Sequence, residues 1–367
     1  MNISVIYLGT KGAGPVYSFE MVRELARRNY NIQCIISSYI ENYNRWTKLA
    51  VDNSNVKLIV VDTYRDKKEF FLSLFKFSCF YKLIQAINGF SPSYIYVPMA
   101  FMWEFAIIPF ISKKIIKIKT MHDVIAHSGK YQNLFQFKIN LSYKCYDKFV
   151  ILSESFRQFL IDKGVSDCNI IHIPHANFDY YSNSLFTSSV SPKQVIGFFG
   201  TISKYKGIDR LLSAFSKLHK DYPNYKLLIA GKGNIHFYKA QLKEIEDNVI
   251  LYNRWIDDDE VAEILQQVDF LVLPYIDASQ SGVIPLAYSF EKPVIATNVG
   301  GLSEQVTEET GILVEPNDET QLIAAMTKLM DDYSLVQNLG CIARKKSTSN
   351  NTWDKSVNIL MANILLS

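Results

Sequence analysis

Short, continuous apolar segments alternate with helix-like patterns along the whole chain and restrict it to one class of fold. In the first half these segments occupy residues 3–8, 32–37, 56–61, 94–97, 115–120 and 149–152. In the second half they occupy residues 195–199, 226–230, 249–251, 270–273 and 294–296, with helical patterns at 209–218, 260–268 and 322–330. Strands that are apolar throughout are buried on both faces, as in parallel sheets covered by helices. The chain is therefore predicted to be an α/β protein with doubly wound parallel sheets.

Two glycine-bearing turns each follow a predicted strand and open a predicted helix. The first is Gly9-Thr-Lys-Gly-Ala-Gly-Pro15, before a helix at 17–28, and the second runs from Gly200 to Gly207, before a helix at 207–221. Backbone N–H groups, a positive helix end and, in the second turn, the ammonium of Lys206 could surround a diphosphate. The alternative is that the glycines only allow strand and helix to pack closely. Two such turns predict two nucleotide-fold halves.

The length of the chain indicates more than one domain. Its 367 residues, 48% of them hydrophobic, are too many for one ordinary core. We expect a first Rossmann-like domain at 1–183 and a second at 193–348, joined by the polar, serine-rich stretch 179–192. Residues 349–367 are expected to form a C-terminal helix, with packing on the first domain as one option. Doubly wound domains bind ligands at the carboxyl ends of their strands, so the sequence predicts a site between the two domains.

Charge is unevenly distributed between the two halves of the chain, and this limits the classes of partner that the protein is expected to bind. Residues 1–185 hold 22 Lys and Arg against 14 Asp and Glu, while residues 186–367 hold 17 against 22. A basic first half fits a phosphorylated substrate or an anionic lipid surface. Nucleic acid is disfavoured, because the basic residues form no continuous stripe and no reader motif is present.

Several other common classes of protein are disfavoured by the sequence. Tyr17 stands where a dinucleotide-binding turn requires its third glycine, and the second strand ends in Ser37 and Ser38 instead of a ribose-binding acid. The five cysteines show neither disulfide nor zinc spacing. The chain begins as a strand and not as a signal peptide, and it contains no apolar run long enough to span a membrane. A reduced, cytoplasmic protein is predicted.

Several motifs resemble one known family. They are the turn 200–207, Ala230-Gly-Lys-Gly233, Val268-Asp-Phe-Leu-Val-Leu-Pro-Tyr275, Lys292-Pro-Val-Ile-Ala-Thr297, Gly300-Gly-Leu-Ser-Glu304 and Thr120-Met-His-Asp123. Together they resemble glycosyltransferase family 4, of the bacterial surface-polysaccharide type. The resemblance implies the GT-B fold, with two Rossmann-like domains facing across a cleft. It also implies retaining transfer of a hexose from a nucleotide diphosphate sugar to a glycan acceptor, which is expected to be lipid-linked.

The resemblance assigns candidate site residues by position. His122 and Lys206 are the catalytic candidates. The donor diphosphate is assigned to Gly12, Gly14, Thr201, Lys206, Ser281, Gly282 and Val283, the donor sugar to His122, Asp123, Gln280 and Ser281, and the nucleoside to Gly231, Arg254, Trp255 and Ile256. Thr201 stands where the family usually has arginine, and Ala278 and Leu286 stand where it has two glutamates.

Each of the main candidates also has a structural interpretation. Lys206 could be an ordinary solvated lysine, and His122 a structural histidine hydrogen-bonded through Asp123. Ser281 and Gly282 could simply cap a helix. The role of His127 is open. Asp257, Asp258 and Asp259 could hold a metal ion, but capping of the following helix is the favoured explanation. No cofactor and no metal is expected, because Lys206 and helix N-termini can stabilise a leaving diphosphate.

The segment 67–82 is rich in lysine and phenylalanine and has two open interpretations. It is either a helix that packs on the core or an interfacial helix at the inner face of the cytoplasmic membrane, with Phe70, Phe71, Phe75 and Phe77 inserting. The function also has two alternatives. A sugar-nucleotide 2-epimerase has the same fold, and a transferase-like binding subunit could have lost catalysis together with the two glutamates.

Overall fold

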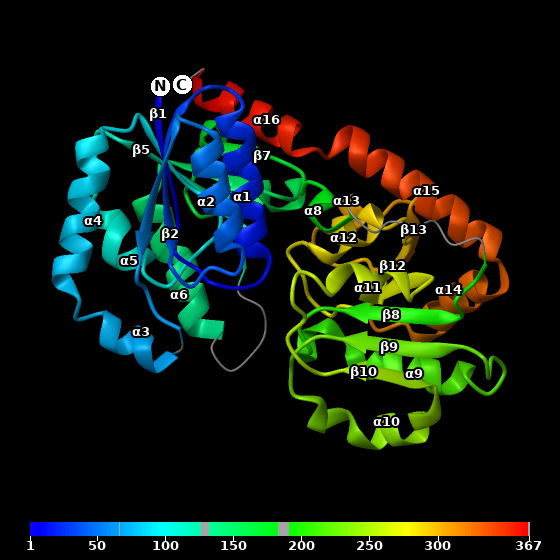
Figure 1. Cartoon of the computed structure of the whole chain (residues 1–367). Coiled ribbons are helices and arrows are strands. Elements are labelled where there is room, and N and C mark those ends of the chain that lie inside the picture. The colour runs from blue at the N-terminus through cyan, green and yellow to red at the C-terminus, as the bar shows by residue number, and fades with distance from the viewer. Residues whose placement is uncertain (66, 126–131, 183–190, 366–367) are drawn as a thin grey trace. The chain divides into compact units, whose positions relative to one another are not determined.

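The chain forms two compact units, each with its own sheet (Figure 1). The computed structural model describes residues 1–65, 67–125, 132–182 and 191–365. The first unit holds Met1–Ile125, Asn133–Pro174 and the segment from Trp353 onward, and the second holds His175–Thr352 together with Gln132. The sequence placed these boundaries near 183 and 349. Part of the stretch expected to join the two domains, Asp179–Ser182, forms the short helix α8, and residues 183–190 lie outside the described residues.

The first unit contains a parallel sheet in the strand order β3-β2-β1-β4-β5-β6-β7. Its strands are β1 (Asn2–Tyr7), β2 (Asn31–Ser37), β3 (Val56–Val61), β4 (Tyr94–Val97), β5 (Ile116–Met121), β6 (Lys148–Ile151) and β7 (Ile170–His172). Central β1 pairs with β2 and β4, so that Val5 lies opposite Cys34 on one side and Tyr96 on the other. The six predicted strands are confirmed within one residue at each end, and β7 was not predicted.

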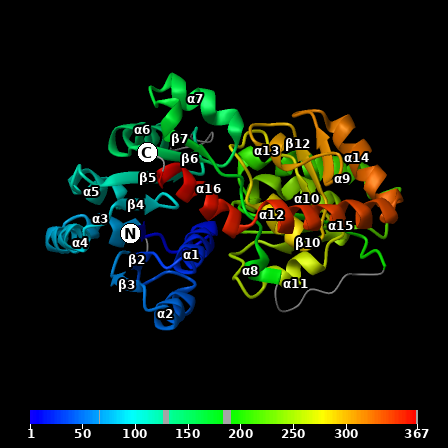
Figure 2. The ribbon, with the colours of Figure 1, turned by 90° about the horizontal axis from the view of Figure 1, so that it is seen from above.

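Helices cover both faces of this sheet (Figure 2). The helices α1 (Ala13–Ala26), α2 (Tyr43–Asp52) and α16 (Trp353–Leu365) lie on one face. The other face carries α3 (Lys67–Ser73), α4 (Phe77–Phe90), α5 (Glu104–Ile107), α6 (Gln132–Cys145) and α7 (Arg157–Asp162). Between these helices and the strands lies a large apolar cluster, here called the main core of the first unit, in which Trp103 is fully buried. The segment expected as one helix at 67–82 is instead divided between α3 and α4.

The second unit contains a parallel sheet in the order β10-β9-β8-β11-β12-β13. Its strands are β8 (Val195–Phe199), β9 (Lys226–Ala230), β10 (Val249–Tyr252), β11 (Phe270–Leu273), β12 (Val294–Thr297) and β13 (Gly311–Val314). The five predicted strands are confirmed, and β13 was not predicted. In both sheets the strand order reverses beside the first strand, which creates the crevice where doubly wound domains bind ligands.

Two groups of helices flank the second sheet. The helices α9 (Ile208–Leu218), α10 (Lys239–Glu244) and α14 (Glu319–Asp331) pack together, as do α8, α11 (Val261–Gln266), α12 (Val283–Ser289) and α15 (Tyr333–Asn350). The short α13 spans Leu302–Gln305. Helix α9 buries Leu211, Leu212, Phe215 and Leu218 along one stripe. It begins after Gly207 (φ +65°), where a Cβ would lie 1.9 Å from the carbonyl oxygen of Pro274. Only glycine permits this close approach.

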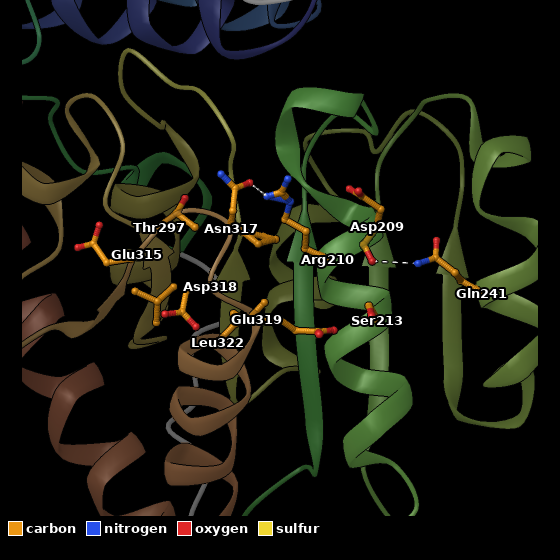
Figure 3. A pocket seen from close by; sticks show the side chains of 12 residues that line it. Asp209, Arg210, Ser213, Gln241, Thr297, Glu315, Asn317, Asp318, Glu319 and Leu322 are labelled. Atoms are coloured by element: carbon orange, nitrogen blue, oxygen red, sulfur yellow. Dashed lines mark hydrogen bonds between the residues drawn. The ribbon is translucent and has the colours of Figure 1, made fainter.

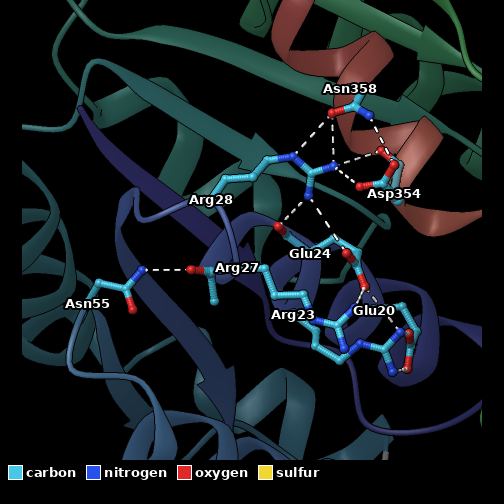
Figure 4. Close-up of polar contacts among 9 residues, drawn as sticks. Glu20, Arg23, Glu24, Arg27, Arg28, Asn55, Asp354 and Asn358 are labelled. Atoms are coloured by element: carbon cyan, nitrogen blue, oxygen red, sulfur yellow. Dashed lines mark hydrogen bonds and ion pairs between the residues drawn. The ribbon is translucent and has the colours of Figure 1, made fainter.

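Helix α16 returns to the first unit and is held against α1. The ring of Trp353 meets that of Tyr17 edge to face at 5.1 Å. Arg28, in the turn that follows α1, donates from Nη2 to Oδ1 of Asn358 at 2.9 Å and pairs with Asp354 (Figure 4). At the far end of α16, the Tyr94 hydroxyl donates to the carbonyl of Ile364 at 2.8 Å. Among the described residues, no helix of the chain is long and apolar enough to cross a membrane.

Candidate functional site

Lys206 lies over the carboxyl end of β8. It sits in the 3-10 turn Lys204–Lys206, and its Nζ lies 3.1 Å from the point where a Cβ on Gly200 would be. The ammonium donates to Tyr275 Oη at 3.0 Å and lies 4.7 Å from the centre of that ring. Since Tyr275 is buried, the lysine is directed toward the strand end and not into bulk water. This placement fits the predicted anion site better than an ordinary solvated lysine.

The start of α12 approaches the same point. A Cβ on Gly200 would lie 3.7 Å from a methyl carbon of Val283. Ser281 is buried, and its Oγ lies 3.5 Å from Tyr275 Oη. The structure therefore brings together Lys206, Ser281 and Val283, which the sequence had assigned to one ligand group, and adds Tyr275.

Gln305 holds the loop before α12 and was missed by the sequence analysis. Its Oε1 accepts from the N–H of Ser281 at 2.8 Å, and its Nε2 donates to the carbonyl of Ser281 at 3.0 Å. The N–H of Val283 donates to Ser281 Oγ at 3.3 Å. Two N–H groups assigned to the diphosphate are thus already hydrogen-bonded. Gln305 directly follows the motif that ends at Glu304, but nothing in its spacing indicates that it reaches Ser281.

Polar groups for a donor sugar are few in this loop. The Oε1 atom of Gln280 is buried and has no hydrogen-bond partner among the described residues, which leaves an acceptor to be satisfied. Ala278 and Leu286, at the positions of the family's glutamates, are both buried. Thr201, at the position of the family's arginine, is exposed.

The residues assigned to the nucleoside follow β9 and β10. Gly231 packs on Gly200, since a Cβ on Gly231 would lie 1.9 Å from the carbonyl oxygen of Gly200. Arg254 donates from Nη1 to the carbonyl of Trp255 at 3.1 Å and to Glu260 at 2.7 Å. This bond to Arg254 lowers the pKa of Glu260 to about 2. Trp255 and the neighbouring Ile256 are half-buried.

The three consecutive aspartates do not act as predicted. The N-cap of α11 is Glu260, which makes no side-chain cap hydrogen bond. Asp258 instead accepts from the hydroxyls of Tyr180 and Tyr181 at 3.2 and 3.0 Å, and so ties α8 to the start of α11. In the described part of the chain, no group of three or more His, Cys, Asp or Glu is placed to hold a metal ion.

In the first unit, His122 follows the carboxyl end of β5. Its Nε2 donates to the carbonyl of Pro98 at 2.9 Å, which leaves Nδ1 as the acceptor nitrogen of the neutral ring. Burial lowers the pKa of His122 to about 4, although the Pro98 carbonyl and the charge of Asp123 act in the opposite direction. The ring of Tyr17 packs on it edge to face at 4.7 Å. A neutral imidazole of this tautomer can accept a hydrogen bond from a sugar hydroxyl. His127 lies outside the described residues.

The first glycine turn is explained mainly by packing. A Cβ on Gly9 or Gly14 would lie 2.3 or 2.1 Å from the hydroxyl oxygen of Tyr7, so a side chain at either position would require the buried Tyr7 ring to move. The N–H of Gly12 donates to a carboxylate oxygen of Glu41 at 3.0 Å. A diphosphate at Gly12 would have to displace that carboxylate. The role assigned to Gly12 and Gly14 therefore stays a prediction.

A separate cavity of about 370 Å³ lies between the N-terminal ends of α9 and α14 (Figure 3). In it, Arg210 donates to Asn317, and Gln241 donates to the carbonyl of Asp209 at 3.0 Å. None of the residues assigned to the donor lines this cavity.

Part of the chain is similar in sequence to known proteins. The family model of the glycosyl transferases of group 1 matches residues 193–332. A glycogen synthase of Mycobacterium tuberculosis is 28% identical over 161 residues, which are 42% of this chain and 38% of the relative. The capsular polysaccharide biosynthesis glycosyltransferase CapM of Staphylococcus aureus is 26% identical over 256 residues, 65% of this chain and 67% of CapM. The match thus spans well under half of the glycogen synthase.

Solved structures resemble the whole chain. Anabaena HepE in complex with UDP and glucose has a TM-score of 0.74 at 16% identity, covering 100% of this chain and 99% of HepE. Sucrose-phosphate synthase of Thermosynechococcus elongatus has a TM-score of 0.70 at 18% identity, covering 100% and 98%. The chain therefore has the GT-B fold predicted from its sequence, and its residues 193–332 match the glycosyl transferases of group 1.

Proposed function

We propose that the chain is a retaining glycosyltransferase that moves a hexose from a nucleotide diphosphate sugar to a lipid-linked glycan acceptor. The observation that carries this proposal is the position of Lys206 Nζ over Gly200, beside Tyr275 and the start of α12. A cation at the switch point of a doubly wound sheet is suited to a diphosphate. CapM, named for capsular polysaccharide biosynthesis, supports a polysaccharide product.

The proposed reaction places negative charge on the diphosphate as it leaves. The acceptor hydroxyl oxygen bonds to C1 of the hexose as the bond from C1 to the diphosphate oxygen breaks. Attack on the face that the diphosphate leaves retains the configuration, and the departing phosphate oxygen takes the hydroxyl proton. Lys206 stabilises the negative charge that grows on the diphosphate. In this proposal His122 accepts a sugar hydroxyl at Nδ1, and Gln280 supplies a second acceptor. Lys206 takes the place of a metal ion in this proposal.

Product analysis tests this function. The purified chain is incubated with UDP- or GDP-hexoses and a polyprenyl-diphosphate sugar, and products are separated by mass and by the NMR coupling of the new anomeric proton. We expect nucleoside diphosphate and a glycoside of retained configuration, at rates that excess EDTA leaves nearly unchanged. A rate that EDTA abolishes and Mn²⁺ restores would contradict the metal-independent part of the proposal.

The same assay separates the two alternatives. An epimerase would return a donor sugar altered at C2 without an acceptor. A binding subunit would take up the donor without turnover, and the observation that favours it is the burial of Ala278 and Leu286 at the positions of the family's glutamates. Either result would contradict the proposed transfer.

A further inference from the structure

Helices α3 and α4, with the turn between them, expose five large apolar side chains. Phe71, Leu72, Phe75, Phe77 and Tyr81 are between 64% and 75% exposed, and they are here called the α3–α4 apolar face. Isolated exposed apolar residues are ordinary on protein surfaces, but five within eleven consecutive positions form a patch of the kind that marks an interaction site.

The orientation of this face is set by the residues between its members. Phe70, Ser73 and Phe80 are buried, and Ser73 Oγ accepts from Trp103 Nε1 at 2.8 Å. The rings of Phe80 and Trp103 pack edge to face at 4.7 Å. Since Trp103 belongs to the main core, α3 and the first turn of α4 cannot turn their exposed side chains inward. The core interpretation of the segment 67–82 is thus confirmed for Phe70 and Phe80, whereas the interfacial interpretation stays a prediction and loses Phe70 from its inserting set.

Lysines outnumber acids around the α3–α4 apolar face, where Glu69 lies in the first turn of α3. Lys68, Lys76 and Lys82 are exposed, and the sequence contains no Asp or Glu between Glu69 and Glu104. In a symmetric dimer the same patch would meet itself, so lysines would lie against lysines. An anionic lipid surface suits both the apolar side chains and the lysines of this face, because it accepts apolar side chains at the acyl boundary and attracts lysines at the headgroups.

We propose that the α3–α4 apolar face docks the chain on an anionic lipid bilayer. The inference rests on exposed side chains and goes beyond the proposed transfer reaction. The face also lies near the ligand-binding edge of its sheet. Trp103, which anchors α3, and Pro98, which accepts from His122, both belong to the segment that follows the carboxyl end of β4. Docking by this face would therefore bring that edge of the first unit near the headgroups, where a lipid-linked acceptor is found.

Vesicle sedimentation with the full chain tests the proposal. We expect binding to vesicles of phosphatidylcholine mixed with phosphatidylglycerol, weak binding to phosphatidylcholine alone, and release at high salt. Replacing Lys68, Lys76 and Lys82 with Gln should lower the partition coefficient about 100-fold, since each lysine near an anionic leaflet contributes about fivefold. The pair Phe75→Ser and Phe77→Ser should lower it at least about tenfold.

Control variants in the second unit test whether the loss of any three lysines, or of any exposed phenylalanine, lowers vesicle binding. Replacing the exposed Lys220, Lys226 and Lys345 of the second unit with Gln removes the same charge, and Phe237→Ser removes an exposed phenylalanine elsewhere. These variants should bind as the parent does, and all variants should keep the parent's melting temperature because the replaced side chains are exposed. The proposal is overturned if the Lys68, Lys76 and Lys82 variant sediments as the parent does. It is also overturned if Phe75→Ser with Phe77→Ser dissociates a dimer of the parent while vesicle binding is unchanged.

Discussion

At the scale of single residues, the position of Lys206 has the most direct consequence for activity. Replacing it with Ala should leave the fold intact and lower kcat about 10²- to 10³-fold, the usual loss when one preorganised charge-stabilising donor is removed. Steady-state rates at saturating donor measure this effect. Lys220→Ala, which removes an exposed lysine beyond the end of α9, is the control and should stay within about twofold of the parent. A kcat for Lys206→Ala within a few-fold of the parent would remove Lys206 from the mechanism.

His122 should make stability depend on pH in mildly acidic solution. Its pKa falls from 6.5 to about 4 on folding because the ring is buried, so the unfolded chain binds the proton more readily in this interval. The free energy of unfolding should therefore fall as the pH drops from 6.5 to about 4, by at most about 3 kcal/mol.

Urea unfolding at several pH values measures this loss, with His122→Gln as the comparison, since glutamine can still donate to Pro98. Burial raises the pKa of Glu20 to about 7, which acts in the opposite direction, so only the difference between parent and variant reports on His122. Equal pH dependence in both proteins would show that His122 is not buried neutral.

Residue types alone did not separate function from packing in the two glycine turns. Both turns have the same pattern of strand, glycine and helix, yet Gly9 and Gly14 make room for Tyr7, whereas Gly200 makes room for Lys206. Which side chain each glycine makes room for depends on where the side chains of Tyr7 and Lys206 point. The sequence pattern does not give these directions. Gln305 was missed for the same reason, because its contact with Ser281 crosses 24 positions of sequence.

At the scale of elements, most strands could be predicted because they are buried on both faces and therefore apolar throughout. The strands β7 and β13 could not, since Ile170–His172 is only three residues long and Gly311–Val314 includes partly exposed positions. The predicted start of a helix was too late where glycine lies in the first turn. Helix α1 begins at Ala13 and includes Gly14, whereas the sequence predicted a start at residue 17. The break between α3 and α4 could not be predicted, because the turn between the two helices is as rich in apolar residues as the helices themselves.

The loop before α12 depends on one side chain from α13. Gln305→Ala should lower the free energy of unfolding by about 2 kcal/mol, because two hydrogen bonds to Ser281 are lost. It should also raise the donor KM, since Ser281 lies beside Tyr275 and Lys206. Donor-dependent kinetics and thermal melting measure the two effects. Gln241→Ala, which loses one bond to the carbonyl of Asp209, should lower stability without changing KM. An unchanged KM in Gln305→Ala would mean that this loop does not hold the donor.

The docking of α16 on α1 depends on Arg28. Replacing Arg28 with Ala removes the contacts to Asp354 and Asn358 and should speed amide hydrogen exchange along α16. The expected loss is about 1–2 kcal/mol, because the bonds involve a charge but the partners are partly exposed. Arg27→Ala removes the same charge from the same turn, but its side chain is 64% exposed and pairs within α1. Exchange in α16 that rises equally in both variants would show that charge, and not the specific contacts, holds this helix.

At the scale of the whole molecule, the two units divide the candidate chemistry between them. The second unit holds Lys206, Tyr275 and Ser281 around one point, and it carries the family match at 193–332. The first unit holds His122 and the α3–α4 apolar face on the segments after β5 and β3. In the proposed function, the second unit would hold the nucleotide and the first would bind the acceptor.

A nucleoside diphosphate should therefore protect the second unit alone. Hydrogen exchange of the full chain with UDP or GDP should slow in peptides covering 200–207 and 280–283, whereas the N–H of Gly12, already bonded to Glu41, should be unaffected. At 100 times its Kd the nucleotide should stabilise its unit by about 2.7 kcal/mol, and Lys206→Ala should remove most of this gain. Protection of residues 9–15 that increases further in Glu41→Gln would instead show that the first turn also takes the diphosphate once the competing carboxylate is gone.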